Sequence, residues 1–356
     1  MRVFADFHHH ALYESLRILF EDRFGWELYR PIGMEWFAEE LWNYERAEWG
    51  ENVAHQYLDP WSDDIDRGDH WERRDRKYPN RIFKMVTLEQ YRAQRWDFVI
   101  ATLDHNDTAY AKIAREKGAR FGIEIGNQWG DRAWGEKPFV LSAIKPDPWP
   151  DGIEGVTLRQ EFDLDQFRYE PPGPFGIISS FMQCYPEGAG YSDWTQAARL
   201  APDLDWRVYG AYGTASDDEW KAGDIERVDD ISVAMRASSV GWHVKRWSDG
   251  FGHVIHNWFA LGRPVLAWTS YYDGRWDGLR RISADLFREG VTSFDITGKP
   301  AEYSVGIIRE LARDQDRYLR MCEETAAHFR RIVDFDAEAD AAHMMLTGEH
   351  ARLVAA

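Results

Sequence analysis

The feature that most constrains the fold is an alternation between short apolar segments and longer amphipathic ones. The apolar run 2–7 precedes a helix-patterned segment that Gly25 ends, and the same order returns at 98–102 and 107–117. Strands that alternate with helices build parallel sheets with helices on both faces. The sequence therefore predicts an α/β protein.

The alternation stops in a segment rich in Pro, Gly and Asp at 145–174 and then resumes. We therefore expect two tandem Rossmann-like, doubly wound domains facing a cleft, an amino-terminal one (1–172) and a carboxyl-terminal one (173–325). The remaining residues, 326–356, have a helix-forming composition and are expected to pack back on the first domain. The stretch from about 35 to 85 shows no clean period, which predicts an irregular insertion.

Composition narrows the functional class. The 356 residues include only two cysteines, in no CxxC spacing, which argues against a disulfide framework and against a structural zinc site. No segment approaches the ~20 apolar residues of a membrane helix, and polar residues soon interrupt the apolar run at the start. The net charge of −18 argues against a protein that coats nucleic acid or anionic membrane over its whole surface. We expect a cytoplasmic enzyme with no membrane partner.

The most informative motif is a glycine turn within 245–266. The segment is predicted to be a strand, then Asp249-Gly-Phe-Gly, then a helix from His253, and finally Gly-Arg-Pro-Val leading into the next strand. Glycines let the backbone approach a ligand closely, and the first N–H groups of a helix attract phosphate. Lys245 and Arg246 precede the turn and could neutralise a diphosphate.

This motif resembles the donor domain of glycosyltransferases with the GT-B fold. Many members have an acidic residue, Gly-Phe-Gly, a second acidic residue eight positions after the first, and a small-Gly-x-Pro-Val ending. Asp249 takes the first acidic place and Asn257 the second. In the family the second acid commonly binds the ribose hydroxyls; an Asn keeps hydrogen-bonding capacity but carries no charge. An Arg and Lys pair of some retaining members is missing at 179–184, so inversion or retention stays open.

The resemblance implies that residues 173–325 bind a nucleotide-diphosphate-sugar and that residues 1–172 bind a hydroxyl acceptor. A UDP-sugar is the default donor, and neither a cofactor nor a metal is expected. The residues implied in donor binding are Lys245, Arg246, Asp249, Gly250, Phe251, Gly252, His253, His256, Asn257, Tyr272 and Asp273. A non-catalytic nucleotide-sugar-binding protein is an alternative, because it would keep the glycine turn.

A second cluster, Asp6-Phe7-His8-His9-His10, follows the first predicted strand. A neutral His here could take the proton of an acceptor hydroxyl, with a carboxylate orienting it. The resemblance implies a base in this place in inverting members, and we expect His8 as the base, Asp6 as its partner and His9 as the substitute. The cluster is also similar to the metal-binding start of amidohydrolase-like and phosphoesterase barrels, so a metal-dependent hydrolase is an alternative. A plain helix-capping loop is a third interpretation.

The acceptor is the least constrained part of the hypothesis. Residues 67–95 contain nine cations and four anions, a local charge of +5 in an acidic chain. If this segment forms a basic face, the acceptor could be a hydroxymethylated base in DNA, because viral members of this fold modify DNA. If neighbouring carboxylates pair with these cations, a small molecule or saccharide is the expected acceptor. The candidate acceptor-binding residues are Arg73, Arg74, Arg76, Lys77 and Asn127.

Overall fold

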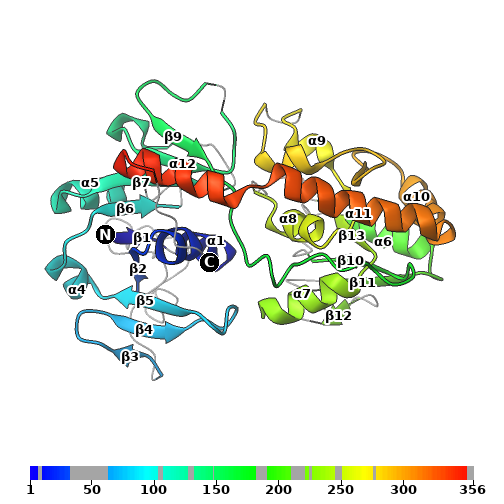
Figure 1. Cartoon of the computed structure of the whole chain (residues 1–356), viewed down its shortest axis with the longest axis horizontal. Coiled ribbons are helices and arrows are strands. Elements are labelled where there is room, and N and C mark those ends of the chain that lie inside the picture. Colours follow the sequence, from blue (N-terminus) through cyan, green and yellow to red (C-terminus); the bar gives the residue numbers. More distant parts are fainter. Residues whose placement is uncertain are drawn as a thin grey trace. The chain divides into compact units, whose positions relative to one another are not determined.

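The computed structural model describes residues 1–6, 10–32, 63–102, 107–126, 132–146, 148–181, 191–209, 221–223, 227–244, 251–275 and 278–350. The chain divides into two compact units, one formed by 1–162 with 335–356 and the other by 163–334. Each unit is built on an open, mainly parallel sheet with helices packed on it (Figure 1). The predicted fold class, α/β with two Rossmann-like units, is confirmed.

In the first unit the sheet of the described residues has the order β3-β4-β5-β2-β1-β6-β7-β8-β9. Its strands are β1 (Arg2–Ala5), β2 (Glu27–Pro31), β3 (Ile65–Asp66), β4 (Trp71–Arg74), β5 (Ile82–Val86), β6 (Phe98–Ala101), β7 (Arg120–Ile125), β8 (Phe139–Ser142) and β9 (Glu154–Thr157). Its helices are α1 (His10–Arg17), the π-helical turn η1 (Ile18–Arg23), α4 (Leu88–Ala93), α5 (Asp107–Lys117), the 3₁₀ turn η3 (Trp134–Glu136) and α12 (Phe335–Thr347).

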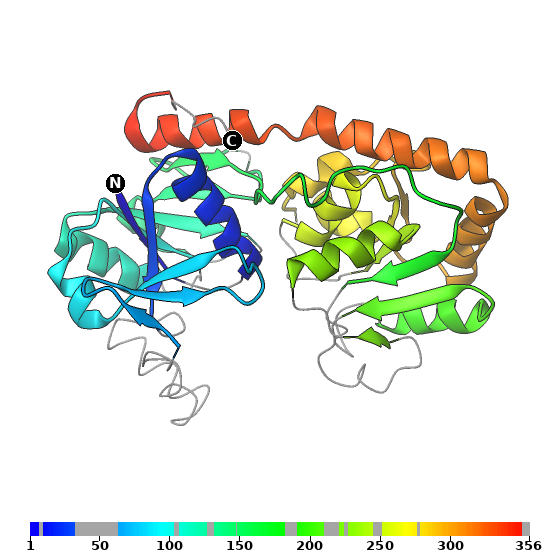
Figure 2. The same ribbon diagram turned by 60° about the horizontal axis from the view of Figure 1, so that its bottom comes forward.

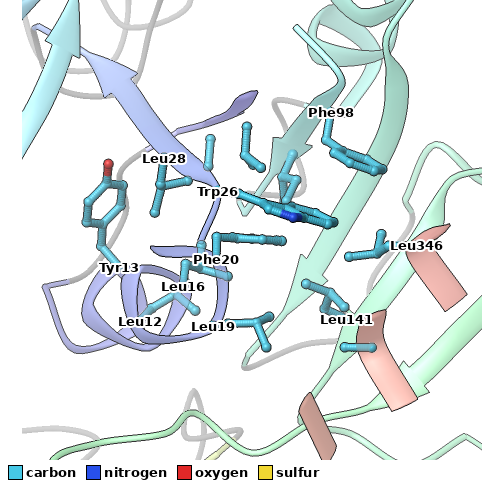
Figure 3. Close-up of a cluster of buried hydrophobic side chains, with 14 of the residues drawn as sticks. Leu12, Tyr13, Leu16, Leu19, Phe20, Trp26, Leu28, Phe98, Leu141 and Leu346 are labelled. Atoms are coloured by element: carbon cyan, nitrogen blue, oxygen red, sulfur yellow. The ribbon is translucent and has the colours of Figure 1, made fainter. Parts of the chain in front are cut away.

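Apolar side chains pack on both faces of this sheet. On one face Trp26 stacks between Phe20 and Phe98, with ring centroids 5.7 and 5.3 Å away, and Leu346 of α12 joins the same cluster (Figure 3). Figure 2 shows α12, in red, lying along β9 in green. On the other face α5 contributes Tyr110, which packs against Phe4. Helices therefore cover both faces, as a doubly wound sheet requires.

The predicted irregular insertion is wrong for its second part. Residues 33–62 lie outside the described residues, but β4 and β5 form an antiparallel hairpin that joins the parallel sheet through β2. The side chains of β5 alternate, with Phe83 and Met85 buried in the core. Asp75 shapes the hairpin turn by accepting hydrogen bonds from the N–H groups of Lys77 and Tyr78 at 2.8 and 3.2 Å. The strands are too short for the alternation to stand out in the sequence.

The second unit has a sheet of the order β12-β11-β10-β13-β14-β15, parallel throughout the described residues. Its strands are β10 (Ile177–Ser180), β11 (Asp205–Tyr209), β12 (Lys221–Gly223), β13 (Val240–His243), β14 (Val265–Ala267) and β15 (Ser293–Asp295). Its helices are α6 (Tyr191–Leu200), α7 (Val228–Ala237), α8 (His253–Ala260), α9 (Thr269–Tyr272), the 3₁₀ turn η5 (Ile282–Leu286), α10 (Ala301–Arg313) and α11 (Gln315–Ile332).

The boundaries between the units differ from the expected 172/173 and 325/326. The first unit ends at Phe162, because the following residues bind to the second unit. There Gln166 donates to Asp229 at 2.6 Å, and Arg236 donates to the carbonyl of Gln166 at 2.8 Å. Helix α11 runs unbroken through residue 325, so the second change of unit falls between α11 and α12.

Candidate active site

Gly252 lies between β13 and α8 and opens α8, in the order that the sequence predicts. Gly252 is the N-cap of α8 and has φ +70, in the left-handed region that favours glycine. A Cβ at this position would lie 3.2 Å from Ile255 Cδ1 and 3.5 Å from Ser283 Oγ. The backbone conformation therefore favours glycine and the space around it is tight, and the first N–H groups of α8 have no partner within the helix itself.

Three of the predicted donor-binding residues pack around this helix start. The Phe251 ring stacks on the His256 ring, with centroids 3.8 Å apart, and His256 Nδ1 lies 3.1 Å from the carbonyl oxygen of Gly252. Asn257 is 4% exposed, and its buried Oδ1 has no hydrogen-bond partner among the described residues. A buried amide oxygen without a donor is rare and marks a place where a ligand hydroxyl could donate.

Tyr272 and Asp273 have different surroundings. Tyr272 is fully buried, and its ring lies beside Gly252. Asp273 pairs with Arg275 at 2.6 Å and lines a cavity of about 550 Å³ along the edge strand β15. Asp295 lines the same cavity and is partly buried. Burial raises its pKa, but hydrogen bonds donated by Thr297 and Thr269 have the larger combined effect, so its pKa is lowered overall. Of the two predicted residues, Tyr272 is the one that the described contacts place beside Gly252.

In the first unit, the carboxyl edge of the sheet gathers buried polar groups from adjacent strands. Asp6 follows β1, is 1% exposed and accepts a hydrogen bond from the Thr102 N–H at 2.7 Å. Glu124, the second-last residue of β7, is 5% exposed. Its Oε1 lies 3.4 Å from Gln160 Nε2, a long contact, and its Oε2 has no hydrogen-bond partner among the described residues.

Burial raises the pKa of Glu124 from 4.5 to about 8. The neighbouring Asp6 carboxyl acts in the same direction, whereas Gln160 and Arg132 oppose the rise. A carboxyl group with such a pKa is mostly protonated at neutral pH, so it can both donate and accept hydrogen bonds. Strongly perturbed carboxyl groups at strand ends are typical of functional sites.

The comparisons with known proteins bear on the whole chain. No protein-family model matches it, and no curated protein matches it in sequence. Among solved structures, Anabaena Alr3699/HepE in complex with UDP-glucose superposes with a TM-score of 0.63 at 12% identity, covering 98% of this chain and 99% of that one. A glycosyltransferase from Rickettsia africae gives a TM-score of 0.60 at 10% identity, covering 98% of both chains.

The chain has the GT-B fold. Both the parallel sheets and the full-length superposition carry this assignment. The barrel alternative is wrong, because within the described residues both sheets of the GT-B fold are open, with β3 and β9 at the two ends of the first. No three His, Cys, Asp or Glu side chains in the described part of the chain lie together as a metal site requires.

Several predicted site residues of this GT-B chain lie outside the described residues. These are His8, His9, Lys245, Arg246, Asp249, Gly250 and Asn127. Their assigned roles therefore stay predictions. None of the helices in the described ranges is long and apolar enough to cross a membrane.

The basic segment 67–95 is extensively paired with carboxylates. Arg73 holds Asp64 through two hydrogen bonds of 2.8 and 2.6 Å, while Arg74 and Arg76 are exposed and Lys77 is half-buried. Further ion pairs join Arg67 to Glu72, Arg81 to Glu14 and Lys84 to Glu21, at 2.7, 2.8 and 2.9 Å. These pairs lower the local positive potential and favour the small-acceptor interpretation.

Of the functional candidates at this edge, the sequence points to Glu124 but not to Thr102. Glu124 begins the polar segment 124–128, which follows a predicted strand and could line a cleft, although its Gly-Asn pair is also typical of an ordinary turn; Thr102 gives no signal. Their one shared sequence feature is a polar side chain at the end of an otherwise apolar strand. Burial and missing hydrogen bonds, which distinguish them, become visible only in the fold.

Proposed function

We propose that the chain is a glycosyltransferase that moves a sugar from a nucleotide-diphosphate-sugar, by default a UDP-sugar, to a hydroxyl acceptor. The observation that carries the proposal is the glycine turn at Gly252, which opens α8 at the carboxyl edge of a parallel sheet in a GT-B fold. The similar Anabaena structure holds UDP-glucose. In this chain the diphosphate is assigned to the start of α8, and the ribose to the buried Oδ1 of Asn257.

Transfer requires that the leaving diphosphate be stabilised and that the acceptor hydroxyl lose its proton. We assign the first task to the N–H groups at the start of α8 together with Lys245 and Arg246. The base that takes the proton of the acceptor hydroxyl is assigned to His8, which Asp6 orients. His9 is the substitute for His8. The hydroxyl oxygen then attacks the anomeric carbon, and the bond from that carbon to the diphosphate oxygen breaks.

The donor site is tested by nucleotide binding to a matched pair of glycine variants. Gly252→Ala places a Cβ against Ile255, whereas Gly298→Ala, in the same unit with φ +64, meets no atom within 4 Å. Both variants carry a similar backbone strain. After a thermal-shift screen of UDP, GDP, ADP and dTDP, calorimetry should show affinity weakened on the order of tenfold in Gly252→Ala only. Equal affinities in the two variants would place the donor site elsewhere.

Catalysis is tested separately from binding, which distinguishes the enzyme from a non-catalytic binding protein. With the best nucleotide-sugar, His8→Ala should lower sugar release to water or to an added acceptor by ~10²–10⁴ while nucleotide affinity is unchanged. A wild type that binds nucleotide-sugar and never cleaves it would favour the binding protein. Activity that disappears on chelation and returns with zinc or manganese would point to metal chemistry at the His8 cluster.

A further inference from the structure

Two buried polar atoms at the carboxyl edge of the first sheet have hydrogen-bonding capacity that the fold does not use. Glu124 and Thr102 are 5% and 7% exposed. Neither Glu124 Oε2 nor Thr102 Oγ1 has a hydrogen-bond partner among the described residues. An unpaired buried polar atom destabilises the fold, so two of them at one edge are a cost that a binding function would account for. A bound ligand would supply the missing partners.

The strand register brings these two residues together. Ala101 of β6 pairs with Ile123 of β7, so the next residues, Thr102 and Glu124, face each other across the two strands on the same side of the sheet. Gly126 keeps this place open, because a Cβ there would lie 3.1 Å from Gln160 Nε2 and 3.5 Å from Glu124 Oε1. Ligands of open parallel sheets bind outside the carboxyl ends of the strands.

The charge of this edge selects among ligands. The groups that act electrostatically on Glu124 are the Asp6 carboxyl and the Arg132 guanidinium. Arg132 is held by Asp107 through two hydrogen bonds of 2.6 and 2.8 Å, so its charge is compensated. The described groups around Glu124 therefore offer acidic and hydroxyl partners, which suit a neutral hydroxyl group and repel a phosphate.

We propose that Glu124 and Thr102 together bind a hydroxyl group of the acceptor, and that the acceptor is a neutral polyhydroxyl compound of the saccharide class. The proposal rests on the proposed function, because it takes the donor to be bound by the second unit. Glu124 and Thr102 each donate a hydrogen bond to a sugar oxygen or accept one from a sugar hydroxyl. These hydrogen bonds orient the acceptor and determine which of its hydroxyl groups reacts. DNA and phosphorylated acceptors are disfavoured at the same edge.

The experiment measures binding of neutral methyl glycosides to the full chain by calorimetry, with and without UDP. The probes are the methyl glycosides of glucose, galactose, mannose and N-acetylglucosamine, with glucose 6-phosphate as the anionic comparison. The variants are Glu124→Leu, Glu124→Gln and Thr102→Val. The matched control is Glu154→Gln, which changes an exposed Glu on β9 of the same sheet.

We expect the wild type to bind at least one glycoside more tightly than glucose 6-phosphate. Glu124→Leu and Thr102→Val should weaken that binding on the order of tenfold or more, because each removes a hydrogen bond in a buried place. Glu124→Gln should stay within roughly threefold, because an amide of the same shape still donates and accepts. Glu154→Gln should bind like the wild type, and the affinity for UDP should not change in any variant.

Thermal melting separates a binding role from a structural one. Glu124→Leu removes an under-bonded carboxyl group and should melt at or above the wild-type temperature while its glycoside binding is lost. Loss of both stability and binding in Glu124→Leu and Thr102→Val would assign them a structural role and overturn the proposal. Binding of no glycoside, or equal binding to all variants, would also overturn it. A wild type that binds glycosides but no nucleotide would instead overturn the proposed donor site.

Discussion

At the residue scale, Glu124 should make the stability of the protein depend on pH. Its pKa is raised by burial to about 8, whereas the unfolded chain has an ordinary value of 4.5. Between these values the folded protein keeps a proton that the unfolded chain releases, so the free energy of unfolding falls as pH rises. The slope should reach up to about 1.4 kcal/mol per pH unit and disappear above pH ~8.

The measurement is urea unfolding of the wild type and of Glu124→Gln from pH 4 to 9. The amide of the variant does not titrate, so the difference between the two proteins isolates this carboxyl from Asp6 and from the other groups that titrate in the same range. As pH rises, we expect the free energy of unfolding of Glu124→Gln to increase relative to that of the wild type. A difference that is flat across this range would mean that Glu124 is ionised in the folded protein and that solvent or Arg132 reaches it.

Single residues differ in how far their place in the site can be predicted from the sequence. Gly252 can be predicted as part of a turn, because glycines between a predicted strand and a predicted helix allow a close backbone approach, and the structure adds that its φ is +70. Asn257 is predicted from its position in a family motif, and its buried, unpaired Oδ1 agrees with a binding role. Thr102 cannot be predicted, because a Thr after a strand is common and its missing partner depends on chain segments far away in sequence.

At the element scale, the hairpin of β4 and β5 is fastened to α1 by a buried ion cluster. Arg17 of α1 lies 2.7 Å from Asp75 in the hairpin turn and 2.5 Å from Glu14, and both Arg17 and Asp75 are 1% exposed. Arg17→Ala would leave the buried Asp75 carboxylate without its arginine, while Glu14 would keep its ion pair with Arg81. We expect it to lower the free energy of unfolding by about 3–5 kcal/mol.

Arg67→Ala is the matched control, because Arg67 pairs with Glu72 on the surface of the same segment, with half of its side chain exposed. An exposed pair contributes about 0–1 kcal/mol. Chemical unfolding of the two variants and of the wild type would measure the loss of unfolding free energy in each variant. Equal, small losses would show that water or rearrangement relieves the cluster, and that burial of Phe83 and Met85 and pairing with β2 contribute more to holding the hairpin.

Elements with a clear period can be predicted well from the sequence, whereas short ones cannot. The helix at 107–117 and the strand at 98–102 correspond to α5 and β6, because their length and apolar pattern leave little choice. The hairpin does not stand out, since β4 has four residues and β5 five, and half of their side chains are charged or exposed. It is held by pairing of β5 with β2, by burial of Phe83 and Met85 and by ion pairs with α1, contacts between distant segments that no local pattern encodes.

At the scale of the whole molecule, the chain leaves the first unit after Phe162 and returns to it with α12. A composition shift indicates that a boundary exists but not where it falls. Residues 163–172 carry the polar and proline-containing character of a linker, yet hydrogen bonds from Gln166 and to its carbonyl tie them to the second unit. The position of a boundary depends on such contacts and not on composition alone.

The returning helix gives the last prediction. Ala342 of α12 is fully buried in the core of the first unit, whereas its neighbour Ala341 is exposed. Ala342→Glu places a carboxylate in that core and should destabilise the first unit by several kcal/mol, whereas Ala341→Glu, with the same change in helix propensity, should be within about 0.5 kcal/mol of the wild type. Hydrogen exchange followed by mass spectrometry should show faster exchange in β8 and β9 of Ala342→Glu, with β13 and β14 as protected as before. Faster exchange in all four strands would mean that the two units unfold as one, and no change in any of them would mean that α12 is dispensable for the first unit.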